Sequence, residues 1–117
     1  MKAILLISHG SHSPEAKEEV SLLLDKLKKK NHGEVFEYAF LEIESPSIPE
    51  GIQSCVEKGA KEIVILLNFL NSGRHVNQDV PRIISEAKVK YPHVSFVLTL
   101  PVGQHPNIID LFLDLIK

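Results

Sequence analysis

The segment "EIVILLNFLNSGRHVNQDVP", residues 62–81, passes from an apolar run through a polar loop to the start of a helix. The apolar run is short and continuous, which is typical of a strand that is covered on both faces. Asp79 and Pro81 are residue types that favour the first positions of a helix. The segment therefore predicts a strand, a loop and a helix in that order, the repeating unit of a parallel sheet.

The same unit recurs on both sides of this segment. Strands are expected at 3–7, 35–41, 62–67 and 94–100. A helix start follows each of them, marked by Ser13 and Pro14, by a capping box of Ser47 and Glu50, by Asp79 and Pro81, and by Pro106. We expect an α/β fold: one domain over residues 1–117, with a four-stranded parallel sheet and helices on both faces. The flavodoxin-like strand order would be 2-1-3-4.

The last expected helix is apolar on two sides. Ile109, Phe112, Leu113 and Ile116 form one apolar face, whereas Ile108, Leu111 and Leu115 form another. A helix with two apolar faces needs two surfaces to pack against. The pattern therefore predicts either a deep groove or a partner subunit, as in a homodimer.

Composition excludes several classes of protein. The net charge of −2 and the absence of a dense Lys/Arg stripe argue against nucleic acid as a partner. The single cysteine, Cys55, has no partner for a disulfide or a Cys-based zinc site and is expected to be a buried structural thiol. No apolar run approaches the roughly 20 residues of a membrane span, and the start lacks a signal-peptide pattern. We expect a cytoplasmic protein with no membrane contact.

Three candidate metal ligands follow three different strands. His9 comes directly after the first strand, Glu42 after the second and His75 in the loop after the third, so all three lie at the carboxyl edge of the expected sheet. Two imidazoles and a carboxylate suit Co²⁺, Ni²⁺, Fe²⁺ or Zn²⁺ and leave coordination positions open. Gly10 and Gly73 would permit tight turns and the approach of a flat ligand, and Arg74 could pair with a carboxylate.

The same residue types also have interpretations that involve no metal site. A lone loop histidine is more often exposed or capping than metal-bound, and one of Glu42 and Glu44 is expected to be simply solvated. His32 and His93 fall at the opposite edge and are expected to be structural, whereas His12 and His105 stay unassigned. The two phosphate-binding loop patterns G-x-G-x-x-G and G-x-x-x-x-G-K-[ST] are both absent. Ser8 precedes His9, whereas arginine precedes the nucleophilic histidine of the histidine phosphatases.

Four stretches together resemble a known family. "LLISHGSHSPEA", "FLEIESPSIPEGI", "FLNSGRHVNQDVP" and "PVGQHPNIIDL" are similar, in this order, to the small class II chelatases, the short-form sirohydrochlorin cobaltochelatases and ferrochelatases. The resemblance covers nearly the whole chain and implies a chelatase-like half with this fold. It departs from many relatives at His12, where they carry arginine.

The resemblance implies an enzyme that inserts a divalent metal into sirohydrochlorin without ATP, in cobalamin or sirohaem biosynthesis. Co²⁺, Fe²⁺ or Ni²⁺ would be the metal substrate, no cofactor would be permanently bound, and short forms would pair as homodimers. The metal ligands would be His9, Glu42 and His75, with His9 also the proton acceptor. Substrate contacts would fall on Gly10, Ser11, Ser45, Pro46, Leu70, Asn71, Ser72, Gly73, Arg74 and His75. The alternative is a non-catalytic carrier of metal or tetrapyrrole that uses the same pocket.

Overall fold

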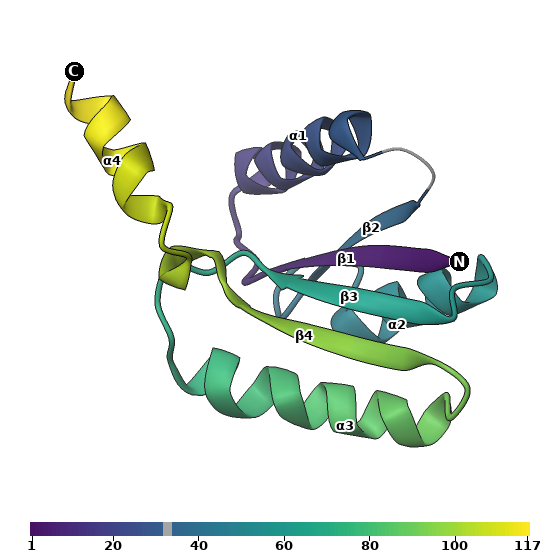
Figure 1. Cartoon of the computed structure of the whole chain (residues 1–117). Helices are drawn as coiled ribbons and strands as arrows, with labels where there is room; N and C mark the ends of the chain where they lie inside the picture. Colours follow the sequence, from purple (N-terminus) through teal and green to yellow (C-terminus); the bar gives the residue numbers. More distant parts are fainter. Residues whose placement is uncertain (32–33) are drawn as a thin grey trace.

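The four expected strands form a single parallel sheet. In the computed structural model, which describes residues 1–31 and 34–117 and omits the side chain of His75, the strands are β1 (Lys2–Ser8), β2 (Val35–Phe40), β3 (Glu62–Leu67) and β4 (Ser95–Pro101). Their order is β2-β1-β3-β4, and every pair is parallel (Figure 1). The predicted fold class and strand order are therefore confirmed, and the strand order changes direction between β1 and β3.

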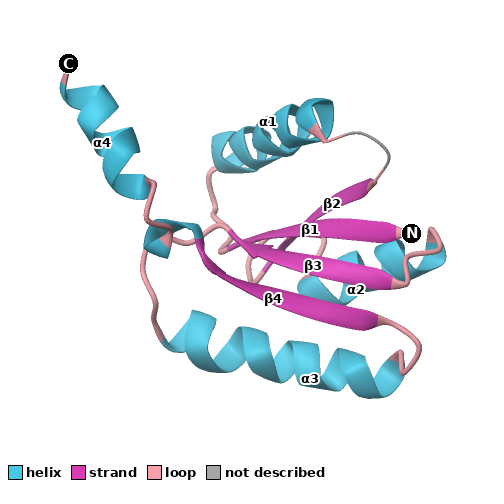
Figure 2. Ribbon diagram, viewed as in Figure 1, coloured by secondary structure: helices cyan, strands magenta, loops and turns pink. Residues whose placement is uncertain are grey.

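Helices cover the two faces unequally. Helix α1 (Pro14–Lys30) lies on one face, while α2 (Ile48–Glu57) and α3 (Val80–Lys90) lie on the other (Figure 2). Helix α4 (Ile108–Ile116) projects from the carboxyl end of the sheet, away from the other helices. None of the described helices is long and apolar enough to cross a membrane.

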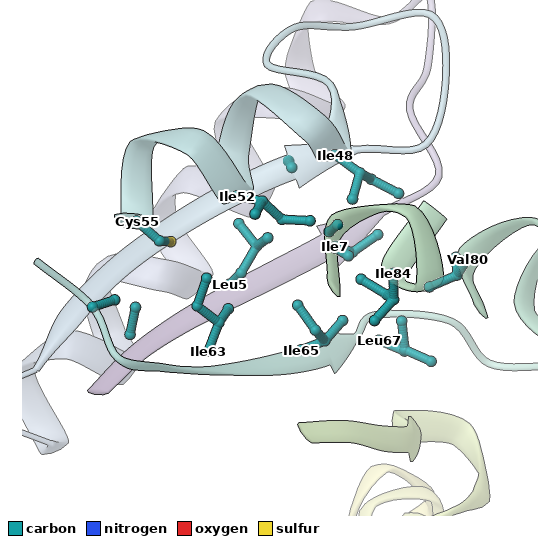
Figure 3. Packing of buried hydrophobic residues seen from close by; sticks show 14 of the residues in the cluster. Leu5, Ile7, Ile48, Ile52, Cys55, Ile63, Ile65, Leu67, Val80 and Ile84 are labelled. Carbon is teal, nitrogen blue, oxygen red and sulfur yellow. The ribbon is translucent and has the colours of Figure 1, made fainter. Parts of the chain in front are cut away.

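The core is built from the alternation of side chains along the two central strands. Leu5 and Ile7 of β1 point to the same side as Ile63 and Ile65 of β3, where α2 and α3 cover them (Figure 3). Ile4 and Leu6 point to the other side, toward α1. Because β1 has helices over both faces, its residues from Ala3 to Ser8 are all buried, as its continuous apolar sequence predicts.

The boundaries of several predicted elements shift by one or more residues. A π-helical turn, η1 (His75–Asp79), precedes α3, so helical backbone begins at His75 instead of Asp79. A 3₁₀ turn, η2 (Val102–Gln104), follows β4, and α4 begins at Ile108 instead of Pro106. The capping box of Ser47 and Glu50 is confirmed, with both hydrogen bonds present. His32 lies outside the described residues.

The edge strand β4 is less covered than its apolar sequence suggests. Its pattern is mostly exposed or half-buried, and Leu100 keeps 69% of its surface exposed. Its neighbour β3 is buried on alternate residues only, because α1 lies toward β1 and β2 and leaves the far part of that face open. The expectation of a strand covered on both faces therefore holds for β1 and only partly for β3.

Candidate functional site

His9 and Glu42 meet at the carboxyl edge of the sheet. His9 follows β1 and Glu42 follows β2, and the Nε2 atom of His9 lies 2.7 Å from the Oε1 atom of Glu42. Both side chains are about half exposed, at 48% and 47%, so solvent and a ligand can reach them. The structure thus brings together two of the three predicted ligands, from segments 33 residues apart in the chain (42 − 9).

Backbone hydrogen bonds continue from the sheet into the loops after β1 and β2, and they hold His9 and Glu42 close together. The N–H of Leu41 donates to the carbonyl of Ser8 at 2.9 Å, and the N–H of Glu42 donates to the carbonyl of His9 at 3.1 Å. Gly10 allows the approach, because its φ is +106° and a Cβ there would lie 1.9 Å from the Glu42 carbonyl oxygen. Gly10 therefore permits the close approach of these two loops, in a backbone conformation that residues with a side chain rarely adopt.

Glu44 has a different role from Glu42, because it binds the backbone of the neighbouring loop. Its Oε1 atom accepts a hydrogen bond of 2.9 Å from the N–H of Ser11, which ties the loop after β2 to the loop after β1 a second time. Between the two glutamates, Ile43 has a φ of +72°, and the N–H of Glu44 donates to the Glu42 carbonyl at 2.8 Å. This is a strained γ-turn, and such strain in a branched residue is characteristic of functional loops.

A third connection joins the ends of β1 and β3. Asn68 donates from Nδ2 to the Oγ of the buried Ser8 at 3.0 Å, and its N–H donates to the Ile7 carbonyl at 2.8 Å. The sequence interpretation assigned no part to Asn68. Its position directly after an apolar strand is the signal that could have singled it out, since polar residues there face the ligand edge.

The loop after β3 lies open beside this edge. Leu70, Asn71, Ser72, Gly73 and Arg74 are all exposed, and Leu70 keeps 64% of its surface in contact with solvent. No atom lies within 4 Å of a Cβ built on Gly73, and its φ is not positive, so the predicted tight turn is absent there while open space is present. Gln104 of η2 donates from Nε2 to the Ser72 hydroxyl.

His75 is placed by its backbone alone. It is the first residue of η1 and follows the loop after β3, the strand that pairs with β1. Its side chain lies outside the described part, so its contact with His9 and Glu42 stays a prediction. Among the side chains that the structure does describe, no three His, Cys, Asp or Glu gather closely enough to hold a metal ion.

The remaining candidate residues are two residues of the loop after β2 and three further histidines. Ser45 and Pro46 lie in the loop after β2, which the hydrogen bond from the Phe40 N–H to the Pro46 carbonyl closes at 2.8 Å. His105 accepts at Nδ1 from the N–H of Asn107, the residue before α4, at 3.0 Å. His12 is exposed beyond β1, and His93 is exposed in the turn before β4, at the opposite edge.

Cys55 takes no part in this site. It is fully buried on α2, and burial is the main cause that raises the pKa of its thiol to about 12. A thiol with so high a pKa is neither a good nucleophile nor a ready metal ligand near neutral pH. The expectation of a structural cysteine agrees with this environment.

Residues 3–117 match the family model CbiX. The chain belongs to the CbiX family. The CbiX match covers both loops that carry His9 and Glu42 and also the segment of His75. The match therefore includes all four stretches in which the sequence resembles the class II chelatases.

Relatives of this CbiX-family chain include proteins of one and of more than one such unit in length. The sirohydrochlorin cobaltochelatase of Priestia megaterium is 36% identical over 95% of this chain and 36% of its own length. The sirohydrochlorin cobaltochelatase of Sulfolobus acidocaldarius is 32% identical over 95% of this chain and 86% of its own. The chain thus spans about a third of the first relative and most of the second.

A solved structure supports the same fold. The sirohydrochlorin chelatase SirB from Bacillus subtilis subspecies spizizenii, in complex with cobalt, superposes with a TM-score of 0.89 at 29% identity. The match covers 99% of this chain and 50% of the SirB chain. One half of SirB therefore has the fold described above, and an equal length of SirB lies outside the match.

Proposed function

We propose that this chain catalyses the insertion of a divalent metal into sirohydrochlorin without ATP, for cobalamin or sirohaem biosynthesis, and that Co²⁺ is the preferred metal. The observation that carries the proposal is the His9–Glu42 pair, held at the carboxyl edge of the sheet in a chain of the CbiX family. The cobalt complex of the related SirB supports Co²⁺, while Fe²⁺ and Ni²⁺ are the alternatives that the same ligand types accept.

The metal would be held by His9, Glu42 and His75. Nitrogen and oxygen ligands lie about 2.0–2.2 Å from a first-row ion such as Zn²⁺, so two of them at a right angle are roughly 3 Å apart. The observed 2.7 Å between Nε2 of His9 and Oε1 of Glu42 is only a few tenths of an ångström shorter. The pair would therefore need little movement to accept an ion from solvent, and His75 would supply the third ligand.

Metallation must also remove two pyrrole protons. A neutral imidazole can accept a proton near neutral pH, but it cannot bind the metal through the same nitrogen at the same time. His9 would alternate between the two roles, first as a metal ligand and then as the proton acceptor when the metal passes to the ring nitrogens, and its half-exposed ring would release each of the two protons to solvent in turn. Glu42, 2.7 Å away, would stabilise the imidazolium that results.

The loops around the pair would hold the macrocycle. Arg74 would meet its peripheral carboxylates, helped by backbone N–H groups at helix starts, and the open space at Gly73 leaves room for a flat ring. The full set proposed to contact substrate is Gly10, Ser11, Ser45, Pro46, Leu70, Asn71, Ser72, Gly73, Arg74 and His75. A single open crevice offers one wall, so we include a second copy in a homodimer, and a cytoplasmic setting, in the proposal.

An absorbance assay tests this function. Protein at a hundredth of the sirohydrochlorin concentration, mixed with Co²⁺, should convert all of the tetrapyrrole to the metallated spectrum. His9→Ala and His75→Ala should each abolish the acceleration, because each removes a ligand, and His9→Ala also removes the base. His93→Ala is the matched control, since it removes an exposed histidine from the opposite edge of the sheet.

The same assay separates enzyme from carrier. A non-catalytic carrier would change the spectrum only in proportion to the protein added, and full activity in both histidine variants would refute the site. Parallel reactions with Fe²⁺ and Ni²⁺ identify the preferred metal by their relative rates.

A further inference from the structure

Ser8 is a polar residue in the interior of the protein. It is the last residue of β1, directly before His9, and it keeps only 6% of its surface exposed. Among the residues that the structure describes, it is the one polar residue that is buried. A buried hydroxyl group needs a hydrogen-bond partner within the protein, because water does not reach it. The residue that supplies this partner is therefore tied to the backbone that carries His9.

Asn68 supplies the partner from the first position after β3. Its Nδ2 atom donates to the Oγ atom of Ser8 at 3.0 Å, and its backbone N–H donates to the Ile7 carbonyl at 2.8 Å. The backbone bond continues the ladder between β1 and β3, and any residue except proline can make it. Only the side-chain bond to Ser8 depends on the presence of an amide at position 68.

Ser8 is thus held from both sides of β1. Its carbonyl accepts the N–H of Leu41, in the loop after β2, at 2.9 Å, while its hydroxyl is bound by Asn68 after β3. Strand β1 lies between β2 and β3, at the point where the strand order changes direction (Figure 1). These bonds meet one residue before the imidazole that contacts Glu42.

The bond between Asn68 and Ser8 is not required to fill the core. Asn68 lines an apolar groove of about 500 Å³ between α1 and β4, together with residues such as Leu6 and Leu66. Two apolar side chains at positions 8 and 68 would leave no polar group unsatisfied, so they would change stability little. Apolar packing has no preferred direction, however, whereas a hydrogen bond has a preferred distance and angle. The specific contribution of the pair is therefore orientation.

We propose that Asn68 is a positioning residue for His9 and acts through Ser8. By holding the Ser8 hydroxyl, Asn68 keeps the end of β1 in one orientation, and so keeps the His9 imidazole at the observed 2.7 Å from Glu42. The inference rests on the proposed function, because it takes His9 and Glu42 as ligands of the metal. Removing a residue that orients metal ligands typically weakens metal binding by about 10–100-fold.

A Co²⁺ titration without sirohydrochlorin tests this role. Leucine is similar in size to asparagine but forms no side-chain hydrogen bond, so Asn68→Leu should weaken Co²⁺ binding by about tenfold in calorimetry. The visible absorption spectrum of bound Co²⁺ should also change, because it reports the geometry of the ligands. Unchanged affinity and spectrum in Asn68→Leu would refute the inference.

The double variant Ser8→Ala with Asn68→Leu separates orientation from stability. It contains no buried hydroxyl without a partner, so its urea midpoint should lie close to that of the wild type. Its Co²⁺ affinity should nevertheless stay about tenfold weaker, as in Asn68→Leu alone. If affinity recovered together with stability, Asn68 would be a structural residue only, and the proposal would be wrong.

Thr99→Val is the matched control. Thr99 lines the same groove, and its hydroxyl donates to the Ile65 carbonyl at 2.9 Å, a side-chain bond from β4 to β3 that reaches no neighbour of a proposed ligand. This variant should keep the Co²⁺ affinity of the wild type. An equal loss in Thr99→Val and Asn68→Leu would mean that any loosening of the sheet weakens the site, which would overturn the specific role of Asn68.

The titration of the wild-type chain distinguishes failure of this inference from failure of the proposed function. A wild-type chain that binds no Co²⁺ would refute the metal site and, with it, the role of Asn68. A wild-type chain that binds Co²⁺, beside an Asn68→Leu variant that binds it equally well, would refute the role of Asn68 alone.

Discussion

Gly10 is the residue on which the meeting of His9 and Glu42 depends most. Replacing it by alanine should displace the loop after β2, because the new Cβ would overlap the Glu42 carbonyl oxygen and the φ of +106° disfavours any side chain. We expect a loss of about 1–3 kcal/mol in the free energy of unfolding, the usual cost of strain at such a position. We also expect metal binding to weaken, and urea denaturation with a cobalt titration measures both.

Gly73→Ala is the control for that change. Its Cβ would meet nothing within 4 Å, and its φ is not positive, so the urea midpoint should stay within error of wild type. If the two alanine variants lost the same stability, the close contact at Gly10 would not be what holds the loops together.

Glu44 is expected to act as a positioning residue for the same pair. Glu44→Ala removes the acceptor for the Ser11 N–H and should loosen the loop of His9, weakening Co²⁺ binding by about tenfold, as is usual for residues that orient ligands. Glu44→Gln keeps an acceptor oxygen and should restore most of the affinity, measured by calorimetry. Equal weakening in both variants would mean that the charge of Glu44, and not its hydrogen bond, matters.

At the site, the pairing of His9 with Glu42 could be predicted from the sequence while the part of Glu44 could not. The first follows from strand order alone, since the carboxyl ends of neighbouring parallel strands share one edge. The second depends on the γ-turn at Ile43, a conformation that branched residues rarely adopt and that no sequence pattern encodes. Whether Gly73 would lie in a tight turn or face open space could not be predicted either, because glycine is common in both settings.

Among the elements, α2 begins at the loop that carries Glu42. The Ser47 hydroxyl accepts from the Glu50 N–H, and the Glu50 carboxylate accepts from the Ser47 N–H. An isolated parallel β-bridge also pairs the backbone of Ser47 with that of Phe40. Hydrogen bonding to Ser47 lowers the pKa of Glu50, as expected for a carboxylate in a capping box. The start of α2 therefore closes the loop from Leu41 to Pro46 at its far end.

Ser47→Ala should cost about 1 kcal/mol of unfolding free energy, the typical value for losing a side-chain cap. Ser13→Ala at the start of α1 is the matched comparison, because Ser13 occupies the N-cap position without a side-chain capping bond. Thermal denaturation should show the larger loss for Ser47. A larger loss at Ser13 would contradict the hydrogen-bond assignment at both helix starts.

Strand and helix types could be predicted from periodicity, but the exposure of β4 and α4 could not. An apolar strand and an apolar helix both suggest burial, and the pattern holds whether the covering surface belongs to the same chain or to another. The two apolar faces of α4 indicated a groove or a partner. Periodicity also does not report the close approach of Gly103 to the Leu70 carbonyl, a contact between the loops after β3 and β4 that precedes the exposed helix α4.

For the whole molecule, the homodimer included in the proposed function would make stability depend on protein concentration. When two folded chains dissociate as they unfold, a tenfold rise in protein concentration stabilises the dimer by ~1.4 kcal/mol, about 0.7 kcal/mol per subunit. At an unfolding entropy of about 2.1 cal/mol/K per residue this raises Tm by about 3 °C for a chain of 117 residues. Calorimetry at several concentrations should show this slope for the wild-type chain and a smaller one for Phe112→Glu, which places a charge on the exposed apolar surface of α4. A wild-type Tm that is independent of concentration would refute the homodimer.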